Sequence, residues 1–333
     1  MNQSIDYSDE GRDPGEDVQR LTAAPGAGQR VDRFLAQALA PVSRTRIQRW
    51  LSLGAILLDG AVVLPSRRLS GLEQIEVTPL PHEAETAFAP DPVDFGVVFE
   101  DEHLMVVDKP VGLVVHPAAG HWRGTLMNGL LHSRPDSARL PRAGIVHRLD
   151  KDTSGLMLVA RSERAFEVLT RMLAERRIHR GYLALSQGVW SGPELIDAPI
   201  GRHPRHRLRM AVVAADHGRM ARTHVHALKA GPSFSLLFCQ LETGRTHQIR
   251  VHLSWAGHPL LADTLYGGIA HPSIHRQALH ASVLELQHPT TGRALQFRSP
   301  LPEDFQNVLA ELRLTGEDVS SALERHLNKR GMT

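Results

Sequence analysis

The 333-residue chain contains a single cysteine, Cys239. One cysteine excludes an intramolecular disulfide framework and a metal site built on cysteines, and it points to a reducing compartment. The chain also lacks any apolar run near the length of about twenty residues that crosses a bilayer, and its N-terminus, MNQSIDYSDEGRDPGED, is acidic and polar. The sequence therefore supports neither export nor membrane insertion, and we expect a cytoplasmic protein.

A large excess of charge of one sign is also absent, because the formal net charge is only +2, although the isoelectric point is about 8.9. The basic residues are nevertheless unevenly placed. RHPRHRLR at 202–209 has four arginines, two histidines and no acid, and RMLAERRIHR at 171–180 has four arginines against one glutamate. Such density is typical of phosphate binding, and it is also found on solvated helix faces and loops.

The first part of the chain shows a change of character near residue 28. Residues 1–27 are rich in Asp, Glu, Gly and Pro, which predicts a disordered leader. From Val31 the apolar residues follow helical spacing, and Ser43 then caps a second expected helix that runs to Leu53. Asp59-Gly60 between two aliphatic runs predicts a hairpin over 55–64, and QIEV completes a small α/β unit that ends near residue 78.

Two arginines of the second expected helix, Arg46 and Arg49, lie on the face away from Ile47 and Leu51, where they can meet solvent or phosphate. The helix pair, the SRTRIQRWL segment and the LGAILLDGAVV hairpin resemble the S4 RNA-binding module. The chain departs from that pattern at Gly71-Leu72-Glu73, where a Gly-Asp pair usually precedes the last strand. The resemblance implies that residues 28–78 bind RNA through Arg46 and Arg49.

A second domain is expected over 94–315. Residues 79–93 hold four prolines and no apolar period, which indicates an interdomain linker. Beyond them the pattern mixes strands (VVFE, HLMVVDK, LMLVA, YLALSQG, SLLFCQLE) with helices from Ser162 to about Ile178 and from Thr246 to Ala256. Because strands do not alternate strictly with helices, we predict an α+β fold with a largely antiparallel sheet. Residues 316–333 are expected to form a polar helical tail.

The segment GIVHRLDKDTSGLMLVA at 144–160 places Asp150 between two apolar runs. A charge among buried neighbours costs several kcal/mol unless it is paired, so Asp150 needs a cationic partner or a function. A second segment, LETGRTHQIRVHL at 241–253, offers Arg250 beside apolar residues. Since a bidentate arginine is well suited to hold a buried carboxylate ionised, the sequence predicts a pair between Asp150 and Arg250.

These two segments, together with GLVVHPAAG at 112–120 and DAPIGRHPRHRLRMAV at 197–213, resemble the RluA family of pseudouridine synthases. The similarity runs from about Phe95 to Phe297 and is greatest to the RluD-like ribosomal RNA group. It implies an isomerase that converts uridine to pseudouridine, with a hairpin loop of large-subunit (23S) rRNA as the favoured substrate. It also implies RNA as the partner and no metal or other cofactor. Nothing in the sequence requires more than a monomer.

The resemblance also implies roles for individual residues. Asp150 resembles the catalytic aspartate, Arg250 the arginine that salt-bridges it, and Tyr182 the tyrosine that lies against the uracil ring. Arg148 resembles the arginine that enters the RNA stack as the target base leaves. The sequence leaves open whether Asp150 forms a covalent adduct or deprotonates the ribose. The family usually shows Lys-x-Tyr, whereas this chain has Arg180-Gly181-Tyr182. Further candidates for RNA binding are His147, Arg245, His247, Arg202, Arg205 and Arg207.

Three other functions can be weighed against this one. The run Asp150-Lys151-Asp152-Thr153 fits the D-x-D-x-T pattern of haloacid-dehalogenase-like, Mg²⁺-dependent phosphotransferases, but His147-Arg148 interrupt the strand that should precede it. The pairs His247/His252 and His116/His121 could ligate a metal, yet neither has the HExxH form. The third alternative is a non-catalytic RNA-binding protein, which the presence of the candidate aspartate, tyrosine and arginine disfavours.

Overall fold

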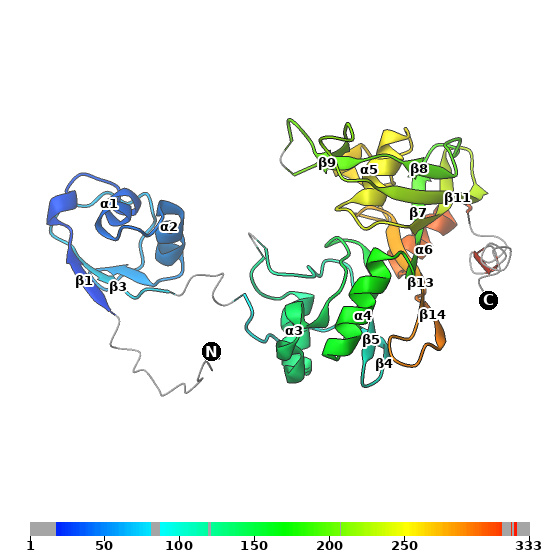
Figure 1. The fold of residues 1–333 in the computed structure, drawn as a ribbon. Coiled ribbons are helices and arrows are strands. Elements are labelled where there is room, and N and C mark those ends of the chain that lie inside the picture. Colours follow the sequence, from blue (N-terminus) through cyan, green and yellow to red (C-terminus); the bar gives the residue numbers. More distant parts are fainter. Residues whose placement is uncertain are drawn as a thin grey trace. The chain divides into compact units, whose positions relative to one another are not determined.

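Figure 1 shows the fold in a computed structural model, which describes residues 18–80, 87–118, 121–206, 208–314, 321 and 323–324. The chain divides into two units, residues 1–85 and 86–333. Most of the expected leader and nearly all of the expected polar tail lie outside the described residues. In the part that is described, no helix is both long and apolar enough to cross a membrane.

The first unit packs two helices on a three-stranded sheet. Its elements are β1 (Gln19–Thr22), a 3-10 turn (Ala24–Gly26), α1 (Val31–Ala38), α2 (Arg44–Ser52), β2 (Ile56–Leu58) and β3 (Gln74–Val77). The strand order is β1-β3-β2, with antiparallel pairing throughout. Both expected helices are present, and the Ser43 hydroxyl accepts a hydrogen bond from the Arg46 N–H at 3.3 Å, as an N-cap should. Their apolar faces pack on the sheet through Leu35, Ile47, Leu51, Ile56, Ile75 and Val77.

Two details of this unit differ from the sequence pattern. Composition predicts a leader to residue 27, but β1 lies inside that stretch and pairs with β3 along its whole length. Most of its residues are exposed at the sheet edge, so the strand carries no strong apolar signal. The turn at Asp59-Gly60 forms, yet its expected second strand does not, and Val62 and Leu64 are 61% and 75% exposed. β3 takes that place beside β2 because Ile75 and Val77 can be buried in the core.

The second unit is built on one large sheet. Its strands are β4 (Gly96–Glu100), β5 (Leu104–Lys109), β6 (Ser154–Ala160), β7 (His179–Gln187), β8 (Leu195–Asp197), β9 (Ile200–Arg202), β10 (Met210–Val212), β11 (Arg222–Ala230), β12 (Phe234–Leu241), β13 (Leu279–Gln287) and β14 (Ala294–Arg298). Its helices are α3 (Leu126–Ser133), α4 (Glu163–Ala174), α5 (Gln248–Trp255) and α6 (Glu303–Glu311), with 3-10 turns at Pro135–Arg139, Pro141–Gly144 and Thr264–Tyr266.

The sheet runs in the order β4-β5-β6-β13-β7-β12-β11-β8, with β14 also paired to β13, while β9 and β10 form a separate pair. Every pairing is antiparallel except that of β6 with β13. The expected α+β fold with a largely antiparallel sheet is thereby confirmed. The five strands named from the sequence correspond to β4, β5, β6, β7 and β12, whereas β8 to β11, β13 and β14 were not recognised in the pattern.

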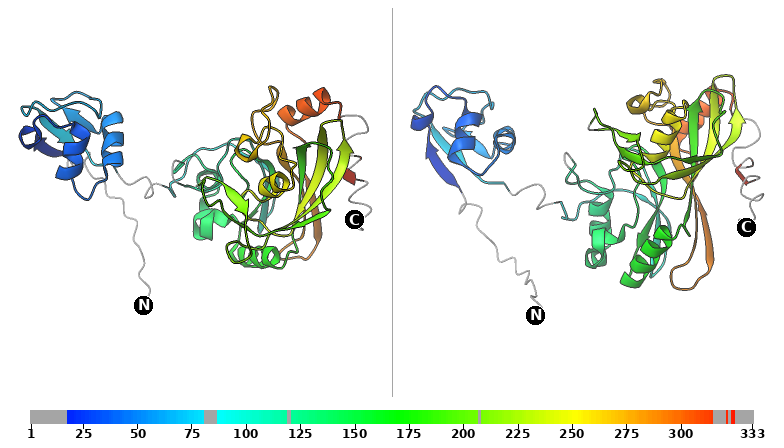
Figure 2. Two further views of the ribbon diagram at one scale, coloured as in Figure 1. Left: turned by 90° about the horizontal axis from the view of Figure 1, so that it is seen from above. Right: turned by 45° about the horizontal axis from the view of Figure 1, so that its top comes forward.

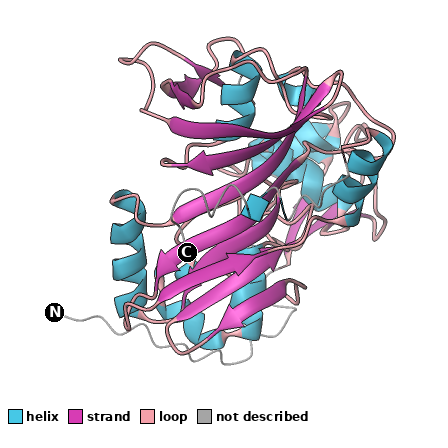
Figure 3. Ribbon diagram, turned by 90° about the vertical axis from the view of Figure 1, so that its right-hand side faces the viewer, coloured by secondary structure: helices cyan, strands magenta, loops and turns pink. Residues whose placement is uncertain are grey.

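Both faces of the large sheet are covered by helices (Figures 2 and 3). On one face, alternate residues of β5, β6, β7 and β12 form a core with α3 and α5, and on the other the intervening residues pack against α4 and α6. Tyr182 of β7 belongs to the first face and its neighbour Leu183 to the second. Because both faces are buried, these strands appear in the sequence as continuous apolar runs.

The stretch expected to be a linker over 79–93 is partly packed against this unit. Ala87 is 3% exposed, and the Asn128 side chain of α3 donates hydrogen bonds to the Ala87 and Ala89 carbonyls, both at 2.8 Å. Asp91 forms an ion pair with Arg123. The later part of this proline-rich stretch is therefore held by specific contacts, and residues 81–86 lie outside the described residues.

One buried histidine makes the stability of this unit depend on pH. His280 of β13 is 1% exposed, its Nδ1 lies 2.9 Å from the Ser154 hydroxyl, and burial lowers its pKa to about 4. The unfolded chain takes up a proton on this residue below pH 6.5, whereas the folded protein does not until about pH 4. We therefore expect His280 to remove up to about 3 kcal/mol of stability as the pH falls through that window.

The measurement is urea unfolding of the wild type and of His280→Gln at pH 7.5 and pH 5. The variant should lose less stability than the wild type on acidification, since glutamine does not titrate. An equal loss in the two proteins would contradict the assignment.

Candidate active site

The segment that carries Asp150 enters the site through an unusual turn. Arg142, Ala143 and Gly144 all have left-handed backbone, with φ of 55°, 52° and 82°. A Cβ on Gly144 would lie 2.0 Å from the Ala160 carbonyl oxygen, so only glycine fits there. The two non-glycine residues each store about 1 kcal/mol of strain, which is characteristic of segments whose conformation is set by function.

Beyond the turn, side chains of the HRLD run point alternately inward and outward. Leu149 is buried in the core, and the His147 Nε2 accepts a hydrogen bond from the Leu158 N–H at 2.9 Å. Arg148 is exposed, and the Asp150 side chain is 16% exposed. The two inward residues thus attach the segment to the sheet, which leaves Arg148 and Asp150 available to a ligand.

The loop that follows Asp150 is held by side chains from two distant segments. The fully buried Lys109 of β5 donates hydrogen bonds to the carbonyls of Pro110, Leu113 and Lys151 at 2.9, 3.0 and 2.9 Å. From the opposite direction, Gln277 donates to the Thr153 hydroxyl at 3.1 Å. Burial lowers the pKa of Lys109 to about 7, against the opposing charges of Asp152 and Asp150.

We expect Lys109→Met to destabilise the protein by roughly 3 kcal/mol, because three carbonyls lose their shared donor. Urea unfolding of the wild type and of the variant measures this effect. Lys229→Met on the partly exposed β11 is the control. An unfolding free energy equal to that of the wild type would contradict the anchoring role.

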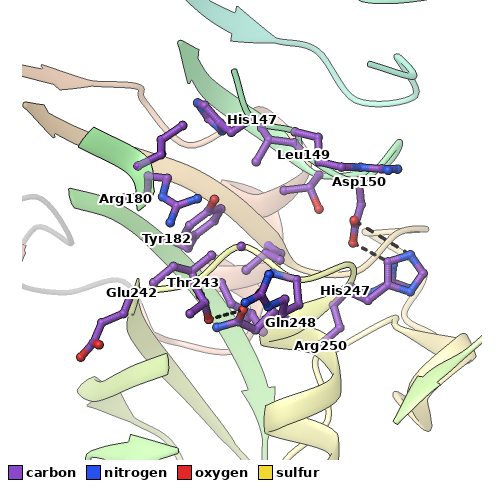
Figure 4. Close-up of a pocket in the computed structure, with 18 of the residues that line it drawn as sticks. His147, Leu149, Asp150, Arg180, Tyr182, Glu242, Thr243, His247, Gln248 and Arg250 are labelled. Atoms are coloured by element: carbon purple, nitrogen blue, oxygen red, sulfur yellow. Dashed lines mark hydrogen bonds and ion pairs between the residues drawn. The ribbon is translucent and has the colours of Figure 1, made fainter. Parts of the chain in front are cut away.

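Asp150 and Arg250 are brought together from positions 100 residues apart. Arg250 lies in the first turns of α5 and donates from Nη1 to Asp150 Oδ2 at 3.0 Å (Figure 4). Its Nε and Nη2 donate to both oxygens of Asp263 at 2.8 and 2.9 Å. The guanidinium therefore makes its bidentate contact with Asp263 and a single contact with Asp150. Burial opposes the charge of Arg250, but the hydrogen bond and charge of Asp263, together with the charge of Asp150, raise its pKa above the usual value.

Asp263 is a member of this site that sequence reasoning missed. Its side chain is 1% exposed, and it follows Ala262, whose φ is 59°. The only signal in the sequence is a single acid directly after the apolar run Leu260-Leu261-Ala262. Its partner could not be read from that run, because the turn that directs the carboxylate toward α5 is a tertiary feature.

His247 lies near the other oxygen of the Asp150 carboxylate. Its Nε2 is 3.9 Å from Asp150 Oδ1, and its Nδ1 is 2.8 Å from the Tyr266 hydroxyl, which accepts a hydrogen bond from the Met210 N–H at 2.9 Å. We assign the Tyr266 hydroxyl as the donor to Nδ1, which gives the hydroxyl and the imidazole a partner each. The proton of the imidazole then resides on Nε2, and this N–H is directed at Asp150. Burial lowers the pKa of His247, so the imidazole is held mainly in its neutral form.

A cavity of about 390 Å³ opens beside the Asp150–Arg250 pair, within the size range of small-molecule sites. Tyr182 contributes a buried side chain to its wall, and burial raises the pKa of that phenol. A second cavity of about 430 Å³ shares Arg148, Asp150, His247 and Arg250 with the first. The candidates that line the first cavity are His147, Arg148, Asp150, Tyr182, Arg245, His247 and Arg250.

The other candidate RNA-binding residues are not among those that line this cavity. Arg202, at the end of β9, and Arg205, in the following loop, are exposed, and Arg207 lies outside the described residues. In the first unit Arg49 is exposed on α2, while Arg46 packs over the Trp50 ring at 5.0 Å and donates to the Leu80 carbonyl at 2.7 Å. In the basic run 171–180, Arg176 and Arg177 pair with glutamates.

Two of the histidines that could be metal ligands, His252 and His116, are largely buried in the protein. His252 is fully buried, with its two ring nitrogens 2.8 Å from the Thr223 hydroxyl and 3.0 Å from the Ala198 carbonyl oxygen. Burial lowers the pKa of His116 to about 4. Across the described ranges, no group of three or more His, Cys, Asp or Glu side chains is arranged to hold a metal ion.

Comparison with known proteins gives the class of this site. The chain matches the family model of RNA pseudouridylate synthase over residues 103–255 and that of the S4 domain over residues 29–75. It is 45% identical over 317 residues to the Ribosomal large subunit pseudouridine synthase D of Nitrosomonas europaea, with 92% of each chain covered. The protein of the same name from Pseudomonas aeruginosa is 45% identical over 311 residues, which cover 89% of this chain and 96% of that one.

A solved structure titled "Human RNA Pseudouridylate Synthase Domain Containing 4" is also similar, with a TM-score of 0.52 and 25% identity over 66% of this chain and 93% of that chain. The chain therefore belongs to the RNA pseudouridylate synthase family, and it carries an S4 domain. It is an isomerase rather than a phosphotransferase or a purely RNA-binding protein, as the resemblance of its motifs predicts.

Proposed function

We propose that this pseudouridine synthase modifies uridines of large-subunit ribosomal RNA, with Asp150 as its essential carboxylate. The observation that carries the proposal is the Asp150 side chain, which lines a cavity, is held by Arg250 at 3.0 Å and shares that cavity with Tyr182. The names of the relatives from Nitrosomonas europaea and Pseudomonas aeruginosa support the choice of RNA. The enzyme would act as a monomer in the cytoplasm, on free rRNA or on an assembling large subunit.

The chemistry fits a site that consists of side chains alone. The reaction breaks the C1'–N1 glycosidic bond of uridine and forms a C1'–C5 bond, with no net redox change and no phosphoryl transfer. A positioned carboxylate in a cavity from which water is largely excluded can start it, either by a covalent adduct or at the ribose. Arg250 holds Asp150 in place, and Tyr182, a neutral phenol at physiological pH, lies against the uracil ring.

Access to the target base calls for a basic surface around the cavity. Extrusion of a base from its stack costs a few kcal/mol, which contacts with the RNA backbone must offset. Arg148, exposed beside Asp150, takes the space that the base vacates, and the base enters a cavity lined by His147, Arg245 and His247. Further backbone contacts come from Arg202, Arg205, Arg207, Arg46 and Arg49. A hairpin loop is the favoured substrate because its bases are already partly unstacked.

The test is to map pseudouridines in total rRNA and tRNA from cells with and without this protein. We expect specific uridines of large-subunit rRNA to lose the modification, and a plasmid-borne wild-type gene to restore it. Loss confined to tRNA or small-subunit rRNA would contradict the proposed substrate. An unchanged map in all of these RNAs would contradict the proposed activity in the cell.

A further inference from the structure

We propose that Arg180 is a catalytic residue that binds a carbonyl oxygen of the uracil ring and stabilises the negative charge on that ring while it is detached from the ribose. The inference rests on the proposed function, because it assigns a contact for the uracil in the Asp150 cavity. Arg180 takes no part in the ion pairs of the site, and its side chain does not stabilise the fold through any contact described above.

Arg180 is a buried cation without a partner. Its side chain lines the cavity, the residue is 8% exposed, and its Nε is fully buried without a hydrogen bond. Among the residues that the structure describes, its guanidinium forms neither a hydrogen bond nor an ion pair. Arg250 and Arg276 are equally buried, but each makes a bidentate contact with an aspartate. Burial of an unpaired charge is strongly unfavourable, and it lowers the pKa of Arg180 below the usual value.

Glu242, an acid that also lines the cavity, is not available to Arg180. Glu242 accepts from Arg176, Arg222 and His224, each at 2.7 Å. The backbone at Gly244 closes over the guanidinium, since a Cβ there would lie 2.9 Å from the Arg180 Nη1. The protein therefore encloses this cation without neutralising it, which is expected when a bound ligand supplies the missing acceptor.

A second unpartnered donor belongs to the same wall. The His147 Nε2 accepts from the Leu158 N–H, so its proton resides on Nδ1, which is fully buried without a partner. Figure 4 shows His147 and Arg180 at one end of the cavity and Asp150 at the other, with Tyr182 beside Arg180. Because the His147 Nδ1 is fully buried, the donor that this end of the cavity presents is the guanidinium of Arg180, which calls for a ligand with an acceptor.

Uracil presents two carbonyl oxygens as acceptors, and the reaction increases the negative charge on them. When the C1'–N1 bond breaks, its electron pair stays on the uracil and spreads over N1, O2 and O4. The ring is neutral again once C1' has bonded to C5, the C5 proton has left and N1 has gained a proton. A cation at a carbonyl oxygen in a site that excludes water therefore favours the charged intermediate over the bound uridine.

The direction of β7 supports this placement. Arg180 and Tyr182 are two residues apart on one strand, so their side chains project from the same face of the sheet. A ring that lies against Tyr182 with its ribose end toward Asp150 has its carbonyl edge directed at Arg180. Asp150 then acts at the sugar and Arg180 at the base.

The experiment uses the full-length protein and large-subunit rRNA transcribed with 5-tritiated uridine, under single-turnover conditions. For Arg180→Met we expect tritium release to slow by about 10²–10³-fold, with unchanged RNA affinity. Its melting temperature should be equal to or higher than that of the wild type, because an unpaired buried charge is removed. Arg139→Met, at an exposed residue with only a 3.8 Å contact to Asp136, is the matched control and should keep the wild-type rate.

Arg180→Lys provides a readout that a structural role would not change. A buried lysine has a lowered pKa, so the rate of this variant should fall as the pH rises through that value, whereas the wild-type arginine stays charged. A rate for Arg180→Met within threefold of the wild type would overturn the inference. So would a slow Arg180→Met enzyme accompanied by Arg180→Lys with the wild-type pH profile. Absence of tritium release from the wild type would instead overturn the proposed function, and this inference with it.

Discussion

We expect the replacement of Asp150 by asparagine to abolish the release of tritium from RNA that contains 5-tritiated uridine, a loss of roughly 10⁴-fold or more. Asparagine keeps the shape of the side chain and can still accept a hydrogen bond from Arg250, which lies 3.0 Å away. It cannot act as a nucleophile or as a base. The protein should therefore remain folded and should still bind RNA with near wild-type affinity, measured by filter binding at fixed salt.

The comparison with Asp152→Asn makes this result specific. Asp152 lies two residues further along the same loop and lines the second cavity rather than the first. Its replacement removes an equal charge close by, and we expect most of the activity to remain. If Asp150→Asn retained activity, or if the two variants lost it equally, Asp150 could not be the essential carboxylate.

We expect the replacement of Arg250 by methionine to lower both the stability and the activity of the enzyme. The substitution leaves Asp150 and the almost fully buried Asp263 without their shared cation. Removal of one partner from a buried ion pair typically lowers the free energy of unfolding by about 3–5 kcal/mol, because the remaining charge is buried without compensation. The rate of tritium release should fall by at least about 10³-fold, since Asp150 loses the group that positions it. Urea unfolding and single-turnover kinetics measure the two effects.

The double variant Arg250→Met, Asp263→Asn separates these effects. Neutralisation of the second carboxylate should restore part of the lost stability, whereas the activity should stay low because Asp150 still lacks its arginine. The difference between the double variant and the sum of the single variants gives the coupling between Arg250 and Asp263. Additive stabilities would show that the bidentate contact contributes no coupling, contrary to its geometry.

The part of this site that could be predicted from sequence consists of residues with unusual neighbours. Asp150 and Arg250 each lie among apolar residues, which is why a pair between them could be expected although 100 residues separate them. The motif resemblance indicated Tyr182 and Arg148 independently of any contact. The pair between Asp150 and Arg250 is present, whereas the roles of Tyr182 and Arg148 stay predictions.

Other features could not be inferred, because they depend on segments that meet only in the folded chain. Asp263 reaches Arg250 from a turn whose geometry includes a left-handed alanine. Lys109 ends an apolar strand, and the sequence does not show that its ammonium group holds the loop after Asp150. The edge strand β1 is mostly exposed, so its pairing with β3 left almost no pattern to recognise.

By itself the sequence determined the S4 domain, the α+β catalytic domain and the family. It also identified the charged residues that lie among apolar neighbours. Each of these could be inferred because periodicity, helix caps and motifs are local properties. Only the tertiary structure decided which of these charges are paired. It gave Arg250 a second carboxylate in Asp263 and left Arg180 buried without one. The physical reason is that an ion pair depends on distances between side chains far apart in the chain, and those distances exist only once the sheet and its helices have packed.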